Sequence, residues 1–121
     1  MAKSVLIVDD SRSMRELLRF TLEGSSYQVT EAADGEEALR KVSAQRFDLV
    51  ITDLNMGAMD GLTLIKNIRG LPSYARVPLL MLTTESSAPK KEAAKQVGAT
   101  GWLVKPFAPE KLLQTVARVM P

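Results

Sequence analysis

A chain of 121 residues has the size of one ordinary domain and is long enough to bury a substantial core without disulfides. It contains no cysteine and no histidine, which excludes disulfides, thiolate nucleophiles, the commonest general base and the commonest transition-metal ligand. The net charge of +2 is too small to indicate nucleic-acid binding, but residues 1–60 carry −4 and residues 61–121 carry +6. The acidic half is expected to attract a cation and the basic half an acidic partner. Solvated helix surfaces account for this charge pattern equally well.

Five apolar stretches have the length and composition of β-strands. In chain order they are residues 4–8, 27–32, 47–53, 77–82 and 101–104. Residues 27–32 are half polar, which is typical of an edge strand. Residues 47–53 form a nearly unbroken apolar run that ends on Asp53, which is typical of a strand buried on both faces of a parallel sheet.

Apolar residues recur at helical spacing after each expected strand, which predicts five helices. The positions that recur are Met14, Leu17, Leu18, Thr21 and Leu22 in the first helix, Ala38, Leu39 and Val42 in the second, and Leu62, Ile65 and Ile68 in the third. The fourth helix carries Lys90, Lys91 and Lys95, and Pro109 opens the fifth, with Leu112, Leu113 and Val116 inward. Gly24, Gly70 and Gly98 are placed to end the first, third and fourth helices. Asp34 and Gly35 are expected to form a turn.

Strands that alternate with helices predict an α/β fold, a doubly wound (βα)5 domain with a five-stranded parallel sheet and helices on both faces. No linker, repeat or low-complexity segment divides the sequence, so residues 1–121 are expected to form a single domain. No stretch has the length of a membrane span and the N-terminal residues lack the apolar segment of a signal peptide. A cytoplasmic location without membrane insertion is therefore expected.

Polar side chains follow four of the expected strands where each strand ends. They are Asp9 and Asp10 after the first strand, Asp53 after the third, Thr83 after the fourth and Lys105 after the fifth. Ligands of open α/β sheets bind outside the carboxyl ends of the strands, so these side chains are expected to share one crevice.

Three carboxylates in one crevice repel each other by about 3 kcal/mol per pair at about 5 Å and an effective dielectric constant near 20. The group therefore either takes up protons or binds a cation. A small set of oxygen ligands favours Mg²⁺ over Ca²⁺, which prefers more of them. Lys105 and Thr83 add a cation and a hydroxyl suited to a phosphoryl oxygen. An aspartate can serve as a nucleophile that forms an acyl phosphate, and a phosphohistidine donor would have to come from another protein.

With these motifs the sequence resembles the CheY-like receiver domains of two-component response regulators, in particular the stand-alone chemotaxis regulators, over essentially all 121 residues. The motifs are Leu-Ile-Val-Asp-Asp-Ser at 6–11, Thr-Asp-Leu-Asn-Met at 52–56 with Met-Asp-Gly at 59–61, Met-Leu-Thr-Thr at 81–84 and Val-Lys-Pro-Phe at 104–107. Each motif alone is weak, but four in this order at strand ends are highly specific. The resemblance implies the flavodoxin-like strand order 2-1-3-4-5.

The resemblance implies that Asp53 is the phosphoacceptor. It also implies that Asp9, Asp10, Asp53 and the main-chain carbonyl of Asn55 hold Mg²⁺. Lys105 would bind the phosphoryl group and precede a cis peptide bond. If the resemblance is set aside, Asp9 and Asp10 are also explained as helix caps, and Lys105 as a surface lysine.

The same resemblance implies that Thr83 and Trp102 form a switch, and that Asn55 and Glu85 tune how readily water reaches the acyl phosphate. Two positions depart from the family pattern. Gly57 replaces a usual proline and is expected to loosen the loop, and Trp102 replaces a usual tyrosine or phenylalanine. Core packing is the alternative role of Trp102, and an ordinary strand-end hydroxyl is that of Thr83.

The function implied is that of a stand-alone receiver with no effector domain, which signals by phosphorylation-dependent protein binding. It would not be an enzyme in the usual sense, although it would catalyse its own phosphoryl transfer and autodephosphorylation. The expected partners are a histidine kinase of the chemotaxis type, an output protein such as a flagellar motor switch protein, and a phosphatase; the protein is expected to be a monomer. Lys90, Lys91 and Lys95 are expected to form part of the partner surface, because their helix lies between Thr83 and Lys105.

Two other functions compete with this interpretation. A phosphohydrolase of the haloacid-dehalogenase type uses an Asp-x-Asp pair, but Asn55 stands where the second aspartate would be. A flavodoxin-type module needs a phosphate-binding loop after the first strand, where Asp9 and Asp10 would repel a phosphate. Incubation with a small phosphodonor and Mg²⁺ distinguishes a stable aspartyl phosphate from turnover of many esters, and a bound flavin would colour the protein.

Overall fold

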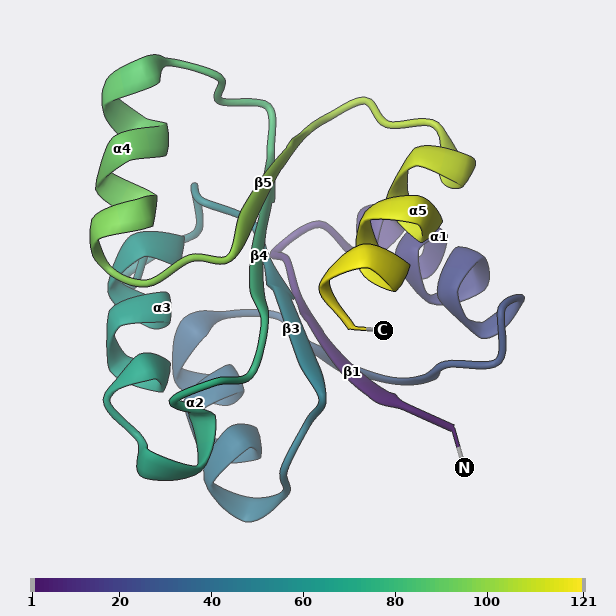
Figure 1. The fold of residues 1–121 in the computed structure, drawn as a ribbon, viewed down its shortest axis with the longest axis horizontal. Helices are drawn as coiled ribbons and strands as arrows, with labels where there is room; N and C mark the ends of the chain where they lie inside the picture. The colour runs from purple at the N-terminus through teal and green to yellow at the C-terminus, as the bar shows by residue number, and fades with distance from the viewer. Residues whose placement is uncertain (1, 121) are drawn as a thin grey trace.

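The computed structural model describes residues 2–120 (Figure 1). The strands are β1 (Ser4–Val8), β2 (Gln28–Ala32), β3 (Leu49–Thr52), β4 (Leu79–Thr83) and β5 (Gly101–Val104). The α-helices are α1 (Arg12–Glu23), α2 (Gly35–Ala44), α3 (Gly61–Arg69), α4 (Ala88–Gln96) and α5 (Pro109–Val119), and a 3-10 helix, η1, spans Pro72–Tyr74. None of the helices in the described range is both long and apolar enough to span a membrane.

The five strands form one parallel sheet in the order β2-β1-β3-β4-β5. This confirms the predicted doubly wound α/β fold, its strand order and the edge position of the second strand. Helices α1 and α5 cover one face of the sheet, and α2, α3 and α4 cover the other (Figure 1). Val8 of β1 is paired with Thr52 of β3, so the residues that follow these two strands emerge side by side.

The core has two apolar layers because both faces of the sheet are covered. Leu6, Val8 and Val50 pack with residues of α2, α3 and α4. Ile7 and Ile51, from the same two strands, pack with residues of α1 and α5 on the opposite face. Successive strand residues point to opposite faces, so a strand buried on both sides is apolar at most of its positions.

Side chains at the start of α2 explain one difference from the sequence prediction. Asp34 caps this helix by accepting a hydrogen bond from the Glu37 N–H at 2.8 Å, and Glu37 accepts one from the Ala33 N–H at 2.7 Å. The predicted turn at Asp34 and Gly35 lies one residue earlier, at the bend of Ala33 and Asp34, because this reciprocal capping starts a helix at Gly35.

Several predicted boundaries shift by one or two residues. β2 begins at Gln28 instead of residue 27, and β3 spans only Leu49–Thr52 of the predicted 47–53. β4 begins at Leu79 instead of residue 77 and ends on Thr83. Gly24 ends α1 as predicted but in a right-handed conformation, and the left-handed residue is Ser26, with φ of 70°.

Candidate functional site

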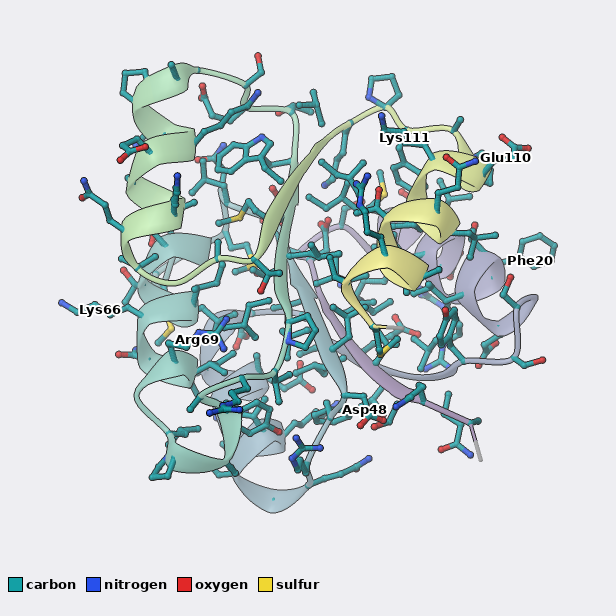
Figure 2. All side chains as sticks on the ribbon, in the orientation of Figure 1. Phe20, Asp48, Lys66, Arg69, Glu110 and Lys111 are labelled. Atoms are coloured by element: carbon teal, nitrogen blue, oxygen red, sulfur yellow. The ribbon has the colours of Figure 1, made fainter. Side chains whose placement is uncertain are left out.

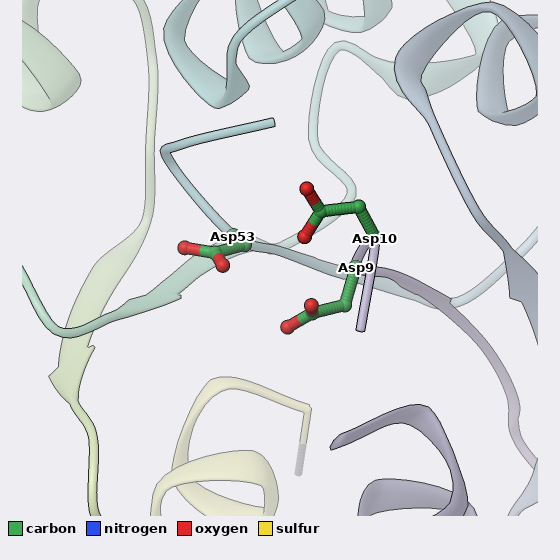
Figure 3. A group of neighbouring side chains, drawn as sticks. All are labelled: Asp9, Asp10 and Asp53. Carbon is green, nitrogen blue, oxygen red and sulfur yellow. The ribbon is translucent and has the colours of Figure 1, made fainter. Parts of the chain in front are cut away.

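Three carboxylates gather at the carboxyl end of the sheet (Figure 3). Asp9, Asp10 and Asp53 each offer a carboxylate oxygen, and these oxygens lie within 4.8 Å of one another. Asp9 and Asp10 follow β1 and Asp53 follows β3, which are paired strands. The sequence prediction placed these three residues in one crevice, and the structure brings them together.

Hydrogen bonds fix the orientation of two of these carboxylates. Asp9 is 2% exposed, and its Oδ1 accepts a hydrogen bond from the Ser11 N–H at 2.9 Å. Asp53 Oδ1 accepts one from the Leu54 N–H at 2.7 Å. The Oδ2 atoms of both residues accept hydrogen bonds from Lys105. Its Nζ lies 2.7 Å from Oδ2 of Asp9 and 3.1 Å from Oδ2 of Asp53.

Lys105 is largely buried, with 10% of its side chain exposed, and forms salt bridges with Asp9 and Asp53. Burial lowers the pKa of the Lys105 ammonium, but hydrogen bonds from this group to Asp9 and Asp53 outweigh burial and raise the pKa above its usual value. Lys105 therefore stays charged at the site, which contradicts the alternative of a surface lysine. The Lys105–Pro106 peptide bond is cis.

Thr83 and Trp102 meet at one residue of the loop between β4 and α4. Thr83 is 1% exposed, and its hydroxyl oxygen accepts a hydrogen bond from the Glu85 N–H at 3.4 Å. The Trp102 indole Nε1–H donates to the Glu85 carbonyl at 3.0 Å, and its ring packs against the core on the α4 side of the sheet. The Glu85 carboxylate accepts a hydrogen bond from the Ser87 N–H, which lowers the pKa of Glu85.

The other predicted residues lie at the protein surface. Asn55 is exposed in the loop between β3 and α3, and Gly57 is exposed in the same loop. Lys90, Lys91 and Lys95 are exposed on α4. Lys91 and Lys95 line a hollow of about 250 Å³ that also reaches Trp102.

The donor set fits a hard divalent cation. Asp9, Asp10 and Asp53 supply only oxygen ligands, as Mg²⁺ prefers, and no nitrogen or sulfur ligand lies among them. The Lys105 ammonium offsets part of the negative charge of these carboxylates. A bound divalent cation would offset the rest, so the charge balance of the site suits such an ion.

Sequence reasoning missed Arg15, whose side chain is hydrogen-bonded to the main chain of Asp9. Its Nη1 donates to the main-chain carbonyl of Asp9 at 2.7 Å, and its Nε donates to Glu31 of β2 at 3.0 Å. Arg15 lies in α1 and Glu31 in β2, so their contact depends on how the helix packs on the sheet. No local spacing in the sequence identifies such a pair.

Three comparisons with known proteins identify the family of this chain. The family model of the response regulator receiver domain matches residues 5–117. The chain is 35% identical over 120 residues to the alkaline phosphatase synthesis transcriptional regulatory protein PhoP of Bacillus subtilis, covering 99% of this chain and 49% of that protein. The chain thus spans about half the length of the curated relatives it matches.

Solved structures match the whole chain. The chemotaxis protein CheY4 of Vibrio cholerae superposes with a TM-score of 0.96 at 51% identity, covering 98% of this chain and 99% of that one. The receiver domain of a sensor histidine kinase of Pseudomonas aeruginosa, described with a magnesium ion coordinated in its active site cleft, gives 0.91 at 28% identity, covering 99% and 98%. Receiver domains are signalling proteins that receive phosphoryl groups from histidine kinases and act on downstream effectors. The chain belongs to the response regulator receiver domain family and is a phosphoacceptor of two-component signalling.

Proposed function

We propose that this protein is a receiver of the chemotaxis type that takes a phosphoryl group from a histidine kinase onto Asp53 and signals by binding another protein. The observation that carries the proposal is the position of Asp53 at the end of β3. Its carboxylate lies beside those of Asp9 and Asp10 and 3.1 Å from the Lys105 ammonium. The proposed nucleophile, Asp53, therefore lies next to the proposed metal ligands Asp9 and Asp10 and to the positive charge of Lys105.

Asp53 suits the acceptor role better than its two acidic neighbours. Asp9 is only 2% exposed, so a phosphodonor cannot readily reach its carboxylate. Asp10 is exposed, and in the described part of the chain Lys105 pairs with Asp9 and Asp53 and not with Asp10. Asp53 is 12% exposed and has Lys105 beside it, so it is both reachable and next to a charge that stabilises a phosphoryl group.

The proposed transfer forms one bond and breaks another. A carboxylate oxygen of Asp53 attacks the phosphorus of the phosphohistidine, and the phosphorus–nitrogen bond of the donor breaks. The histidine nitrogen keeps the bonding electrons and takes up a proton from solvent. Lys105 offsets negative charge on the phosphoryl oxygens throughout the transfer.

Asp9, Asp10, Asp53 and the main-chain carbonyl of Asn55 would hold Mg²⁺. When bound, the ion supplies positive charge that neutralises the carboxylates and the phosphoryl oxygens. The acyl phosphate carries about −1.5 to −2 in place of one carboxylate charge and presents three acceptor oxygens. The buried hydroxyl of Thr83 is proposed to donate a hydrogen bond to one of these phosphoryl oxygens. Asn55 and Glu85 would control the access of water to the acyl phosphate.

The output is proposed to pass through Trp102 and the lysines of α4. Trp102 is joined to Thr83 through the peptide units of Glu85, and it borders the hollow lined by Lys91 and Lys95. A chemotaxis role is supported by the similarity to the chemotaxis protein CheY4, of whose chain this protein covers 99%. A flagellar motor switch protein is proposed as one output partner. A role as a phosphate sink for a kinase would use the same chemistry with a different output.

Labelling with a small phosphodonor tests the proposal. The wild-type protein and Asp53→Asn would be incubated with acetyl phosphate and Mg²⁺, or with a phosphorylated histidine kinase, and the aspartyl phosphate located by mass spectrometry. Asp53→Asn should fold normally and lose the label, because the amide preserves shape but removes the nucleophile. Full labelling of Asp53→Asn would show that another residue is the acceptor. Turnover of many phosphate esters would indicate a hydrolase.

A further inference from the structure

The first residue of α3 lies directly against the main chain of Asp53. A Cβ atom added to Gly61 would overlap the Asp53 carbonyl oxygen and lie 2.9 Å from the Leu54 Cα. The Gly61 N–H also donates a hydrogen bond to the Leu54 carbonyl at 2.8 Å. The atoms in the way belong to the backbone, so a side chain at position 61 must displace the chain at Asp53 and Leu54.

The peptide unit between Asp53 and Leu54 is also held from its other sides. Its carbonyl oxygen accepts a hydrogen bond from the Thr52 hydroxyl at 2.9 Å, and Thr52 is buried. Its N–H donates to Asp53 Oδ1 at 2.7 Å. The same peptide unit therefore touches Gly61 and Thr52 and orients the Asp53 carboxylate.

We propose that Gly61 and Thr52 are positioning residues for the reaction at Asp53. They fix the tilt of the Asp53–Leu54 peptide unit, and this tilt directs Oδ1 to the Leu54 N–H and Oδ2 to Lys105. The inference rests on the proposed role of Asp53 as acceptor. Small displacements of a reacting group are costly, since an error of about 1 Å can slow a reaction by about 100-fold.

Gly57 provides a matched control for Gly61 in the same loop, because a Cβ added to Gly57 meets no atom within 4 Å. Gly61→Ala should slow labelling of Asp53 by acetyl phosphate by about 100-fold. It should also weaken Mg²⁺ binding, measured by calorimetry with the metal alone, by about 10-fold. Gly57→Ala should leave both values unchanged. Equal effects of the two variants, or none from Gly61→Ala, would overturn the role of Gly61.

Thr52 provides a second test that does not depend on a steric clash. Thr52→Val keeps the shape and removes the hydroxyl, whereas Thr52→Ser keeps the hydroxyl. We expect Thr52→Val to shift the NMR resonance of the Leu54 amide and to slow labelling, and Thr52→Ser to restore both. An unchanged Leu54 resonance with wild-type labelling in Thr52→Val would overturn the inference, even if Gly61→Ala failed to fold.

The proposed function and the inference fail in different ways. If the wild-type protein were not labelled on Asp53, the proposed function would be wrong. The Leu54 resonance and the Mg²⁺ affinity would still decide whether Gly61 and Thr52 hold the peptide unit. If the wild-type protein, Gly61→Ala and Thr52→Val were all labelled equally fast on Asp53, only the inference would be wrong.

Discussion

The ammonium of Lys105 lies 2.7 Å from Oδ2 of Asp9, although the two residues are 96 positions apart in the sequence. Both side chains are largely buried, and the same ammonium lies 3.1 Å from Asp53. Because a buried carboxylate needs a compensating charge, Lys105 serves as the resident cation of the acidic cluster. A metal ion that binds the same carboxylates takes over part of this task.

Removing this resident cation should make the protein depend more strongly on Mg²⁺. We expect Lys105→Met to lower the free energy of unfolding by about 3 kcal/mol in metal-free buffer, because it leaves Asp9 buried without a counter-charge. Added Mg²⁺ should raise the unfolding temperature of Lys105→Met by more than that of the wild type, since ligand binding stabilises the folded state. The exposed Lys66 supplies the control, and Lys66→Met should behave as the wild type. An equal response of Lys105→Met and wild type to Mg²⁺ would contradict the prediction.

Glu31 predicts a pH dependence of stability. Burial raises the pKa of Glu31, but hydrogen bonds from Arg19 and Arg15 outweigh it and hold the pKa below its usual value. A lowered folded-state pKa gives stability that is present above the unfolded-state value and lost as pH falls through the folded-state value. Glu31→Gln should therefore lower the free energy of unfolding by about 1–2 kcal/mol at pH 7. Urea unfolding across pH should show this difference closing as the pH falls through the lowered pKa of Glu31.

The control for Glu31 is Glu16, which pairs with Arg12 at 3.2 Å where both side chains are well exposed. Exposed pairs contribute little to stability, so Glu16→Gln should match the wild type at every pH. A constant difference between Glu31→Gln and wild type from neutral to acid pH would show that the carboxylate charge is not the cause.

Tyr74 of η1 joins this 3-10 helix to the chain between the end of α2 and the start of β3. Its hydroxyl accepts a hydrogen bond from the Phe47 N–H at 3.1 Å and lies within hydrogen-bonding distance of the Val42 and Gln45 carbonyls, at 3.2 and 2.9 Å. Burial raises the pKa of Tyr74, so the hydroxyl keeps its proton. Tyr74→Phe should lower the free energy of unfolding by about 1–3 kcal/mol, because it leaves the buried Phe47 N–H without a partner. Urea unfolding with an unchanged m value would support this, and Tyr27→Phe, at the half-buried second tyrosine, should have a smaller effect.

The contacts of Tyr74 are an example of what could not be predicted from the sequence. Apolar periodicity predicted the five strands and the five helices, because each of these patterns is local. The strand order was implied by the family resemblance and not by the periodicity. The 3-10 helix η1 was not predicted, and β3 was predicted to begin at residue 47. The Phe47 N–H is bonded to a tyrosine 27 positions away and not to a neighbouring strand, which no local pattern reveals.

The candidate site divides in the same way. Asp9, Asp10 and Asp53 were found in the sequence because each follows a strand, and strand pairing then brings them together. Gly61 was seen only as part of a motif, because its contact with the Asp53 main chain depends on how α3 returns to the sheet. The roles of these residues in phosphoryl transfer stay predictions until they are measured.

The exposed lysines of α4 are predicted to bind an acidic partner surface. Reversing Lys90, Lys91 and Lys95 to glutamate should weaken binding to the proposed output partner, for which a flagellar motor switch protein is the first candidate to test. Exposed pairs worth about 0.5–1 kcal/mol each predict a loss on the order of tenfold or more. The loss should shrink at high ionic strength, because salt screens exposed charges. Binding would be measured by calorimetry with beryllofluoride present, and labelling of Asp53 should be unchanged.

A second triple variant controls for the change in net charge. Lys3, Arg40 and Lys66 are also exposed, and their reversal to glutamate alters the charge equally without touching α4. This control should bind the partner more tightly than the α4 variant. Equal losses would indicate a general charge effect, and loss of both labelling and binding in the α4 variant would indicate misfolding.

Trp102 should report on the state of the site through its fluorescence. Its indole N–H holds the Glu85 carbonyl, and the Glu85 N–H is bonded to the Thr83 hydroxyl. If Thr83 moves toward a phosphoryl group, the loop moves with it and leaves space that the half-buried indole fills. Two such conformations need to differ by only a few kcal/mol for phosphorylation to shift their populations.

With Mg²⁺ and beryllofluoride, the Trp102 emission should therefore shift to shorter wavelength as the indole loses contact with water. Because this is the only tryptophan in the chain, the signal has one source. The shift should vanish in Asp53→Asn, which cannot hold the phosphoryl mimic, and should shrink in Thr83→Ala, which breaks the connection to Glu85. Unchanged emission with normal phosphorylation and partner binding would make Trp102 static packing. The signal would then pass through the backbone of the loop after Thr83 without movement of the indole.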